Sequence, residues 1–224
     1  VTSSEAGFSI MGNDIMFGLS AVKNVGEGAV RSILQARENG GFPSLHAFCE
    51  RVDLRAVNRK VIESLIKAGA FDCLERPRSQ LFAMVEDAIE RGSRAQKKAG
   101  EGQLAIFAPH EVPDASPAMD GMIRNLPEWS ETRLLSHEKE VLGIYLSGHP
   151  LEKSSEVIST YATVTTRSVA QVAAGSSVWI GGLLTHVHRK STRRDNKRMA
   201  ICLLEDRDGR IEVVFYPEKY EEFS

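Results

Sequence analysis

Between residues 15 and 92, apolar residues recur at helical spacing in short runs that are separated by frequent turns. The clearest run predicts one buried helix face, formed by Leu81, Met84, Val85, Ala88 and Ile89. Ser44 and Asn58 stand where helix N-caps are expected, and Gly69 stands where a helix would end in a left-handed residue. These features predict a compact unit of short helices.

From Arg91 to about Trp129, prolines and isolated charges replace this pattern and predict a linker. Helical spacing returns over 131–146. After Ser176 the apolar period changes to two, which predicts three strands, carrying Val178, Ile180, Gly182 and Leu184, then Met199, Ile201 and Leu203, then Ile211, Val213 and Phe215. The Asp208-Gly209 pair between the last two strands indicates a tight turn.

Composition places the chain among ordinary folded domains, with 42% hydrophobic and 26% charged residues over 224 positions. No apolar stretch reaches the roughly 20 residues of a membrane helix, and the start does not resemble a secretory signal, so a cytoplasmic location without membrane contact is expected. Cys49, Cys73 and Cys202 show no metal-site spacing and are expected to be reduced, buried thiols.

The segment from Leu19 to Val30 predicts a short helix, a hairpin with a G-x-G sequence and a second helix. Glycines let the backbone turn sharply and approach a ligand closely, while unpaired N–H groups at a helix start attract phosphate. We expect DNA binding at Lys23, Asn24, Val25, Gly26 and Gly28, although Glu27 opposes it by repulsion. The alternative is a simple turn between packed helices. A degenerate copy without G-x-G spans 65–71.

An apolar pentapeptide interrupts the linker at Gln103, Leu104, Ala105, Ile106 and Phe107. Such a segment suits docking into a preformed apolar pocket, with Gln103 fixing its orientation by hydrogen bonds. The alternative is that its large side chains fold back onto a neighbouring domain.

A cationic segment joins the first two predicted strands and contains Arg189, Lys190, Arg193, Arg194, Lys197 and Arg198 against the single acid Asp195. Short strands with a long cationic loop are typical of the start of an OB-fold, which binds single-stranded nucleic acid. Trp179 and Tyr216 are candidates for stacking on bases. The alternative is a solvated loop and packing aromatics, and only three of the five OB strands are visible.

Other candidates for chemistry are weaker. Asp206 and Asp208 fit a turn better than a metal site, and His186 and His188 share a strand face but lack a third ligand. Neither the paired acids of a two-metal site nor a P-loop is recognisable, so we expect no catalytic residue, metal or cofactor in this segment.

In order along the chain, four phrases resemble the alpha subunits of bacterial DNA polymerase III, in the region behind the fingers. They are FGLSAVKNVGEGAV (17–30), NRKVIESLIKAGAFD (58–72), EKEVLGIYLSGHP (138–150) and LEDRDGRIEVVFYPEKY (204–220). The resemblance implies an α+β multidomain fold. It places an all-α tandem helix-hairpin-helix domain at 1–92, a linker with the sliding-clamp-binding pentapeptide at 93–130, a helical connector at 131–175 and a partial OB-fold β-barrel at 176–224.

The same resemblance implies that the parent enzyme is a DNA-directed DNA polymerase that uses Mg²⁺ and carries its catalytic aspartates elsewhere. Its implied partners are duplex and single-stranded DNA, the sliding clamp (beta subunit) and other polymerase III holoenzyme subunits. Two other functions stay open, a protein-interaction scaffold that does not touch DNA and a fragment of a DNA-repair nuclease or ligase. The net charge of −2 favours the scaffold modestly.

Overall fold

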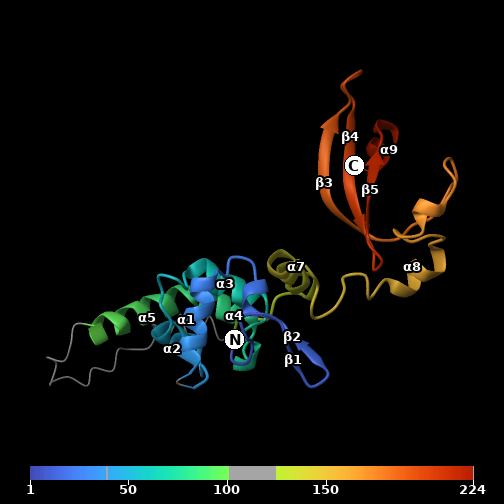
Figure 1. Ribbon diagram of the computed structural model, residues 1–224. Coiled ribbons are helices and arrows are strands. Elements are labelled where there is room, and N and C mark those ends of the chain that lie inside the picture. The colour runs from blue at the N-terminus through green and yellow to red at the C-terminus, as the bar shows by residue number, and fades with distance from the viewer. Residues whose placement is uncertain (39, 101–124, 224) are drawn as a thin grey trace. The chain divides into compact units, whose positions relative to one another are not determined.

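The computed structural model describes residues 1–38, 40–100 and 125–223 (Figure 1). The chain divides into two compact units, Val1–Ser147 and Gly148–Ser224. The first unit is mainly helical and the second contains a small antiparallel sheet, which confirms the expected α+β class. The four-part division expected from the sequence is finer than these units and stays a prediction.

The first unit starts with a two-stranded hairpin, β1 (Ser9–Met11) and β2 (Asp14–Met16), and a 3-10 turn, η1 (Leu19–Ala21). The helices that follow are α1 (Glu27–Arg37), α2 (Leu45–Arg51), α3 (Arg59–Lys67), η2 (Asp72–Leu74), α4 (Arg78–Ala83), α5 (Val85–Gly100) and α7 (Glu131–Leu142). Their shared core contains fully buried Phe48 and Phe71, whose rings meet edge to face at 4.9 Å. This core holds the helices at fixed positions.

The predicted caps are confirmed. The Ser44 hydroxyl accepts a hydrogen bond from the N–H of Ala47 at 3.1 Å, and the Asn58 side chain accepts one from Val61 at 3.2 Å. Gly69 adopts a left-handed φ of +77° after α3. Each cap satisfies backbone groups that a helix end leaves without an intrahelical partner.

The beginning of the predicted linker is helical, because α5 continues through Gly100. The Gln96 side chain donates to the carbonyls of Cys49, Glu50 and Val52 at 3.0, 3.2 and 2.7 Å. These are carbonyls at the end of α2, so a contact between distant parts of the chain extends the helix beyond the point where composition alone predicts its end.

Helix α7 is part of the same unit. Glu138 on α7 is fully buried and accepts hydrogen bonds from the N–H groups of Leu146 and Ser147 at 2.8 and 2.9 Å and from Arg78 Nη1 at 3.0 Å. Burial raises the pKa of Glu138, but these donors outweigh burial and lower it below its usual value. The chain that returns after the undescribed residues therefore packs onto the helices that precede them.

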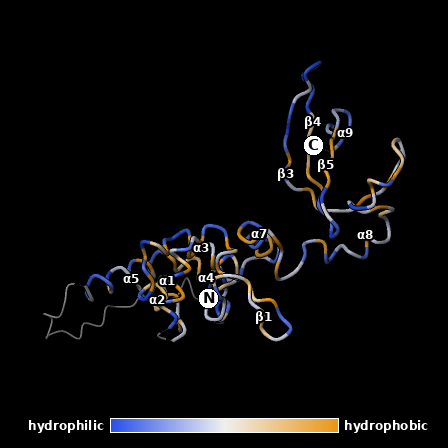
Figure 2. The backbone as a smooth tube through the Cα atoms, viewed as in Figure 1, coloured by the Kyte–Doolittle hydropathy of each residue, from blue (hydrophilic) through white to orange (hydrophobic). Residues whose placement is uncertain are grey.

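The second unit contains α8 (Ser155–Tyr161), η3 (Val169–Gln171), β3 (Leu183–Ser191), β4 (Arg198–Glu205), β5 (Arg210–Phe215) and α9 (Pro217–Phe223). The sheet is antiparallel in the order β3-β4-β5, and Figure 2 shows hydrophobic residues along β4 and β5. Ala200, Cys202 and Leu204 of β4 are buried. The expected three strands are present in the described part of this unit.

The first strand begins later than expected, at Leu183 and not at Val178. Before it, the carbonyl of Trp179 accepts from the N–H groups of Thr163 and Val164 at 2.8 and 3.3 Å, so this stretch pairs with an irregular segment outside the sheet. Within the described ranges, no helix is long and apolar enough to cross a membrane.

Candidate nucleic-acid interface

The first hairpin is fixed to the core on its inner side. Leu19, Val22 and Val25 are buried, and the Val25 N–H donates to the Val22 carbonyl at 3.1 Å to close the turn. The N–H of Lys23 donates to the carbonyl of Val141 in α7 at 2.8 Å. Two sequence-distant segments therefore hold the backbone of the turn in one position.

The outer side of this hairpin presents the start of α1. Gly26 is the N-cap and offers no side-chain acceptor, and its carbonyl takes the first helical hydrogen bond, from the N–H of Val30 at 3.0 Å. The N–H groups of Glu27, Gly28 and Ala29 come before that bond and have no partner within the helix. Together with the positive end of the helix dipole, they form a place where an anion is stabilised.

The glycines at this helix start are not required by the fold. Gly26 has a φ of −81°, which any residue can adopt, and a Cβ at Gly26 would have no atom within 4 Å. A Cβ at Gly28 would meet only Ala56, at 3.9 Å. The left-handed residue of the turn is Asn24, with a φ of +71°. The expectation that the glycines make the sharp turn is therefore wrong for Gly26, whose surface is free of neighbouring atoms within 4 Å of a Cβ.

The second hairpin is closed by the chain's own side chains. A Cβ at Gly69 would collide with the guanidinium of Arg78. That guanidinium donates to Asp72 Oδ1 and Oδ2 at 2.8 and 2.6 Å and to buried Glu138 at 3.0 Å. An arginine that fills the turn and is neutralised by two carboxylates leaves no open set of N–H groups for a phosphate.

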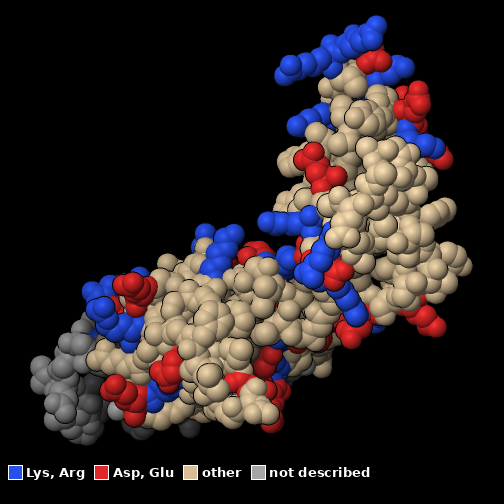
Figure 3. All heavy atoms as spheres, turned by 45° about the vertical axis from the view of Figure 1, so that its right-hand side comes forward, with Lys and Arg blue, Asp and Glu red and all other residues tan. Residues whose placement is uncertain are grey.

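In the second unit, Lys and Arg side chains gather at the end of the β3–β4 hairpin (Figure 3). Arg189 and Lys190 lie on β3 and Arg198 on β4, so only part of the cationic segment is the loop expected from the sequence. Arg193 and Arg194 lie in the exposed turn between the strands.

Trp179 and Tyr216 are the two aromatic residues considered for base stacking. They are 70% and 67% exposed, so both side chains are available to a ligand. The His pair is less suited to metal binding, because a bulge between Thr185 and His188 disturbs the strand and His186 has a positive φ of 51°. Across the described ranges, no group of three or more possible ligands for a metal ion comes together.

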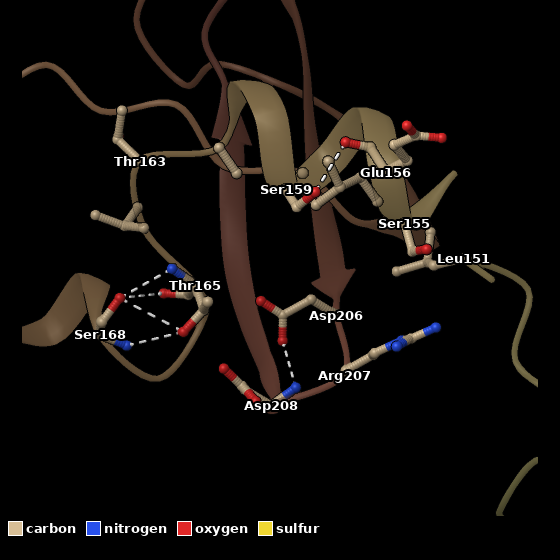
Figure 4. A pocket seen from close by; sticks show the side chains of 14 residues that line it. Leu151, Ser155, Glu156, Ser159, Thr163, Thr165, Ser168, Asp206, Arg207 and Asp208 are labelled. Carbon is tan, nitrogen blue, oxygen red and sulfur yellow. Dashed lines mark hydrogen bonds between the residues drawn. The ribbon is translucent and has the colours of Figure 1, made fainter. Parts of the chain in front are cut away.

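A groove of about 580 Å³ lies beside the β4–β5 turn, between α8 and residues 163–168 (Figure 4). Asp206 accepts from the hydroxyl of Thr166 at 2.6 Å and from the N–H groups of Asp208 and Gly209 at 2.8 and 3.0 Å. Burial raises the pKa of Asp206, but these bonds outweigh it and lower the pKa. Asp206 therefore holds two turns together, which confirms the turn and gives it a structural role.

Comparisons with known proteins relate this geometry to a family. A model of the helix-hairpin-helix motif matches residues 1–81. The chain is 36% identical over 211 residues to the DNA polymerase III subunit alpha of Vibrio cholerae, covering 94% of this chain and 18% of the relative. The chain is 37% identical over 231 residues to the Thermus aquaticus subunit, and this match covers 100% of this chain and 18% of the relative. The chain is 34% identical over 230 residues to the Mycobacterium tuberculosis subunit, and this match covers 100% of this chain and 19% of the relative.

The chain is a relative of the DNA polymerase III alpha subunits. The similarity runs along nearly all of this chain, but the chain spans less than one fifth of the length of these relatives. The resemblance seen in the sequence is confirmed.

Only some of the residues expected to contact DNA are exposed in the structure. Lys23, Gly26 and Gly28 are exposed, whereas Val25 is buried and can offer only its backbone. The Asn24 amide donates to the hydroxyl of Ser64 at 3.0 Å and so ties the hairpin to α3. The pentapeptide of Gln103, Leu104, Ile106 and Phe107 lies outside the described residues.

Two features of the structure were not predicted from the sequence. Arg31 and Arg55 are exposed beside Gly28, although they are separated in the sequence and belong to no motif. The cysteine expectation also needs correction, because Cys49 and Cys202 are buried but Cys73 is exposed. Burial, with a smaller contribution from Glu50, raises the pKa of Cys49 to about 12.

Proposed function

We propose that this chain is the DNA-holding and processivity segment of a replicative DNA-directed DNA polymerase. The observation that carries the proposal is the open start of α1 after Gly26, within the region that matches the helix-hairpin-helix motif. Three adjacent N–H groups without helical partners face a surface that no side chain covers at Gly26. Similarity to polymerase III alpha subunits supports the replicative setting.

The ligand of this site is the sugar–phosphate backbone of duplex DNA. Backbone N–H groups and an exposed lysine bind phosphate oxygens but do not distinguish bases, so binding is independent of sequence. Release of condensed counterions makes such binding weaken steeply as salt rises. A polymerase that moves along its template needs this kind of contact, because every step presents the same phosphates.

Duplex binding tests the proposal directly. We expect the chain to bind a fluorescent duplex at low salt, and we expect Lys23→Glu and Gly26→Asp to weaken binding by adding a negative charge at the helix start. Lys98→Glu makes the same charge change as Lys23→Glu at an exposed position on α5 and serves as its matched control. Equal affinities for all four proteins would contradict the proposal.

Clamp docking is a second part of the proposed function. The pentapeptide would insert Leu104, Ile106 and Phe107 into an apolar pocket of the sliding clamp, while Gln103 supplies hydrogen bonds. Leu104→Ala combined with Phe107→Ala should abolish binding to the clamp and leave duplex affinity unchanged. A clamp titration that does not distinguish the double variant from the parent would contradict this role.

The cationic hairpin of the second unit is proposed to approach the single-stranded template as the beginning of an OB-fold. Reversing the charges of Arg193 and Arg194 should weaken single-strand binding and reduce its salt dependence, since each lost phosphate contact lowers the slope. If single-strand affinity does not change, the hairpin is only a solvated loop. Trp179→Ala separately tests whether base stacking contributes.

The parent polymerase is proposed to work in the cytoplasm with other holoenzyme subunits and to use Mg²⁺ at catalytic aspartates outside this segment. The isolated chain is therefore expected to bind primed DNA without extending it. Metal-dependent nicking by the chain would favour a repair nuclease. Failure to bind either form of DNA, together with retained binding to replication proteins, would favour a scaffold.

A further inference from the structure

A second surface for DNA lies next to the start of α1. The loop of residues 53–58, which leads from α2 to α3, runs beside α1 and forms a groove of about 690 Å³ with it. Its lining includes Gly28, Arg31 and Ser32 from α1 and Asp53, Arg55 and Ala56 from the loop. Because Gly28 belongs to both surfaces, the groove continues directly from the helix start.

The groove is held open by local contacts. The Ser32 hydroxyl accepts a hydrogen bond from the N–H of Asp53 at 2.7 Å, which fixes the start of the loop to α1. Val57, near the end of the loop, is fully buried. A ligand would therefore meet a preformed surface, which lowers the conformational cost of binding.

Two arginines provide positive charge along this groove. Arg31 is exposed and takes part in none of the ion pairs found within the described ranges. The Arg55 side chain is 92% exposed, and its Nε lies 3.1 Å from Oδ1 of Asp53, which is itself 44% exposed. A second contact joins Arg55 Nη2 to Oδ2 of Asp53 at 3.3 Å, but the pair is open to solvent, so a phosphate can compete with Asp53 for Arg55.

Acidic residues and a structural arginine limit the charge of the groove. Glu50 and Asp53 also line it. Arg51 lines it too, but its guanidinium donates to the carbonyls of Ala36, Gly40 and Gly41 and is engaged in the fold. Arg31 and Arg55 are therefore the cations of this groove that can turn to a ligand.

Because the second hairpin is closed, further phosphate contacts must come from another surface. Its turn is filled by Arg78, so it cannot supply a second set of backbone contacts. Charges along one DNA strand follow at about 3.4 Å of helix axis, so a strand held at Gly28 carries its next phosphates over the adjoining surface. That surface is the groove with Arg31 and Arg55.

We propose that Arg31 and Arg55 bind the phosphates that adjoin the one held at the start of α1. This inference rests on the proposed function, because it assigns further contacts to the same duplex. The duplex-binding surface then consists of one open hairpin and one cationic groove, in place of two equivalent hairpins. The bound chemistry is the sugar–phosphate backbone, without base recognition.

Salt titrations of duplex affinity test this assignment on the whole chain. Each phosphate contact contributes about 0.9 to the slope of log affinity against log salt, which corresponds to a factor of about eight between 0.1 M and 1 M salt. We expect Arg31→Gln and Arg55→Gln each to reduce the slope by about 0.9 and to weaken binding at 0.1 M roughly eightfold. Asp53→Asn should strengthen binding, because it frees Arg55 and removes a repelling charge.

Arg76→Gln is the matched control, because it removes an exposed arginine beside the second hairpin. It should leave the slope and the affinity unchanged. A loss equal to that of the two groove variants would show a general charge effect and overturn the assignment. Wild-type slopes in Arg31→Gln and Arg55→Gln would overturn it as well.

These outcomes differ from a failure of the proposed function. If Lys23→Glu weakens duplex binding while both groove variants behave as the parent, the open hairpin binds DNA and the groove does not. If the parent chain does not bind the duplex at low salt, the proposed function itself fails. Thermal unfolding of each variant verifies that the exposed substitutions leave the fold intact.

Discussion

Replacing Gly26 by Ala separates DNA binding from stability. The substitution adds one methyl group at the N-cap of α1, where φ is −81° and no atom lies within 4 Å of the new Cβ. Ala is a poorer N-cap than Gly by less than about 1 kcal/mol, whereas removing a glycine from the unfolded chain stabilises the fold by about 0.4–1 kcal/mol. The two effects oppose each other, so the free energy of unfolding should change by no more than about 1 kcal/mol.

Under the proposed function, the same methyl group crowds a phosphate that approaches the N–H groups of Glu27 and Gly28. Loss of one hydrogen bond to a charged group costs about 1.5–3 kcal/mol, which corresponds to a decrease in affinity of roughly 10- to 150-fold. Fluorescence anisotropy with a duplex at low salt measures the affinity, and denaturant unfolding measures the stability. Gly7→Ala is the control, because a Cβ at Gly7 also meets nothing within 4 Å.

Two results would refute this reasoning. If Gly26→Ala binds the duplex as tightly as Gly7→Ala does, the start of α1 does not contact phosphate closely. If Gly26→Ala unfolds much more easily than the parent, the glycine is needed by the fold and the surface at Gly26 is not open.

Further predictions concern charge, burial and thiol reactivity. Glu27→Gln should raise duplex affinity in an anisotropy titration, because it removes a repelling carboxylate, and an unchanged affinity would place the phosphate elsewhere. Glu138→Ala should lower the free energy of unfolding by about 3 kcal/mol, because it removes the acceptor of the Leu146 and Ser147 N–H groups and leaves Arg78 paired with Asp72 alone. The donors around Glu138 lower its folded-state pKa below that of the unfolded chain, so this acid contributes stability that is present above the ordinary glutamate pKa and is lost as the pH falls through the folded-state pKa. The Glu138→Ala variant should lack that part of the acid dependence in denaturant titrations. A thiol reagent should label Cys73 rapidly and Cys49 only on unfolding, and equal rates would contradict the burial of Cys49.

Features that depend on neighbouring residues were predictable from the sequence. The caps at Ser44 and Asn58 and the stop at Gly69 are confirmed, because each satisfies backbone groups within a few residues of itself. The Asp208-Gly209 turn is confirmed for the same reason. Local hydrogen bonding decides such positions, and the sequence displays it directly.

Features that depend on distant contacts were not predictable. The continuation of α5 through Gly100 depends on Gln96 contacting the end of α2, and the late start of β3 depends on Trp179 pairing with residues 163–164. Glu138 stands among charged neighbours in the sequence, and nothing there indicates that it is buried against Arg78. The exposed Cys73 and the groove arginines likewise reflect how separate helices come together.

The most direct test of the central claim is a map of backbone amide chemical shifts while a short duplex is added to the isotope-labelled chain. We expect the largest shifts on the N–H groups of Glu27, Gly28 and Ala29, which precede the first helical hydrogen bond. The shifts should be the same for duplexes of different sequence, and salt should reverse them. Largest shifts at the second hairpin around Gly69, with the α1 amides unaffected, would contradict it.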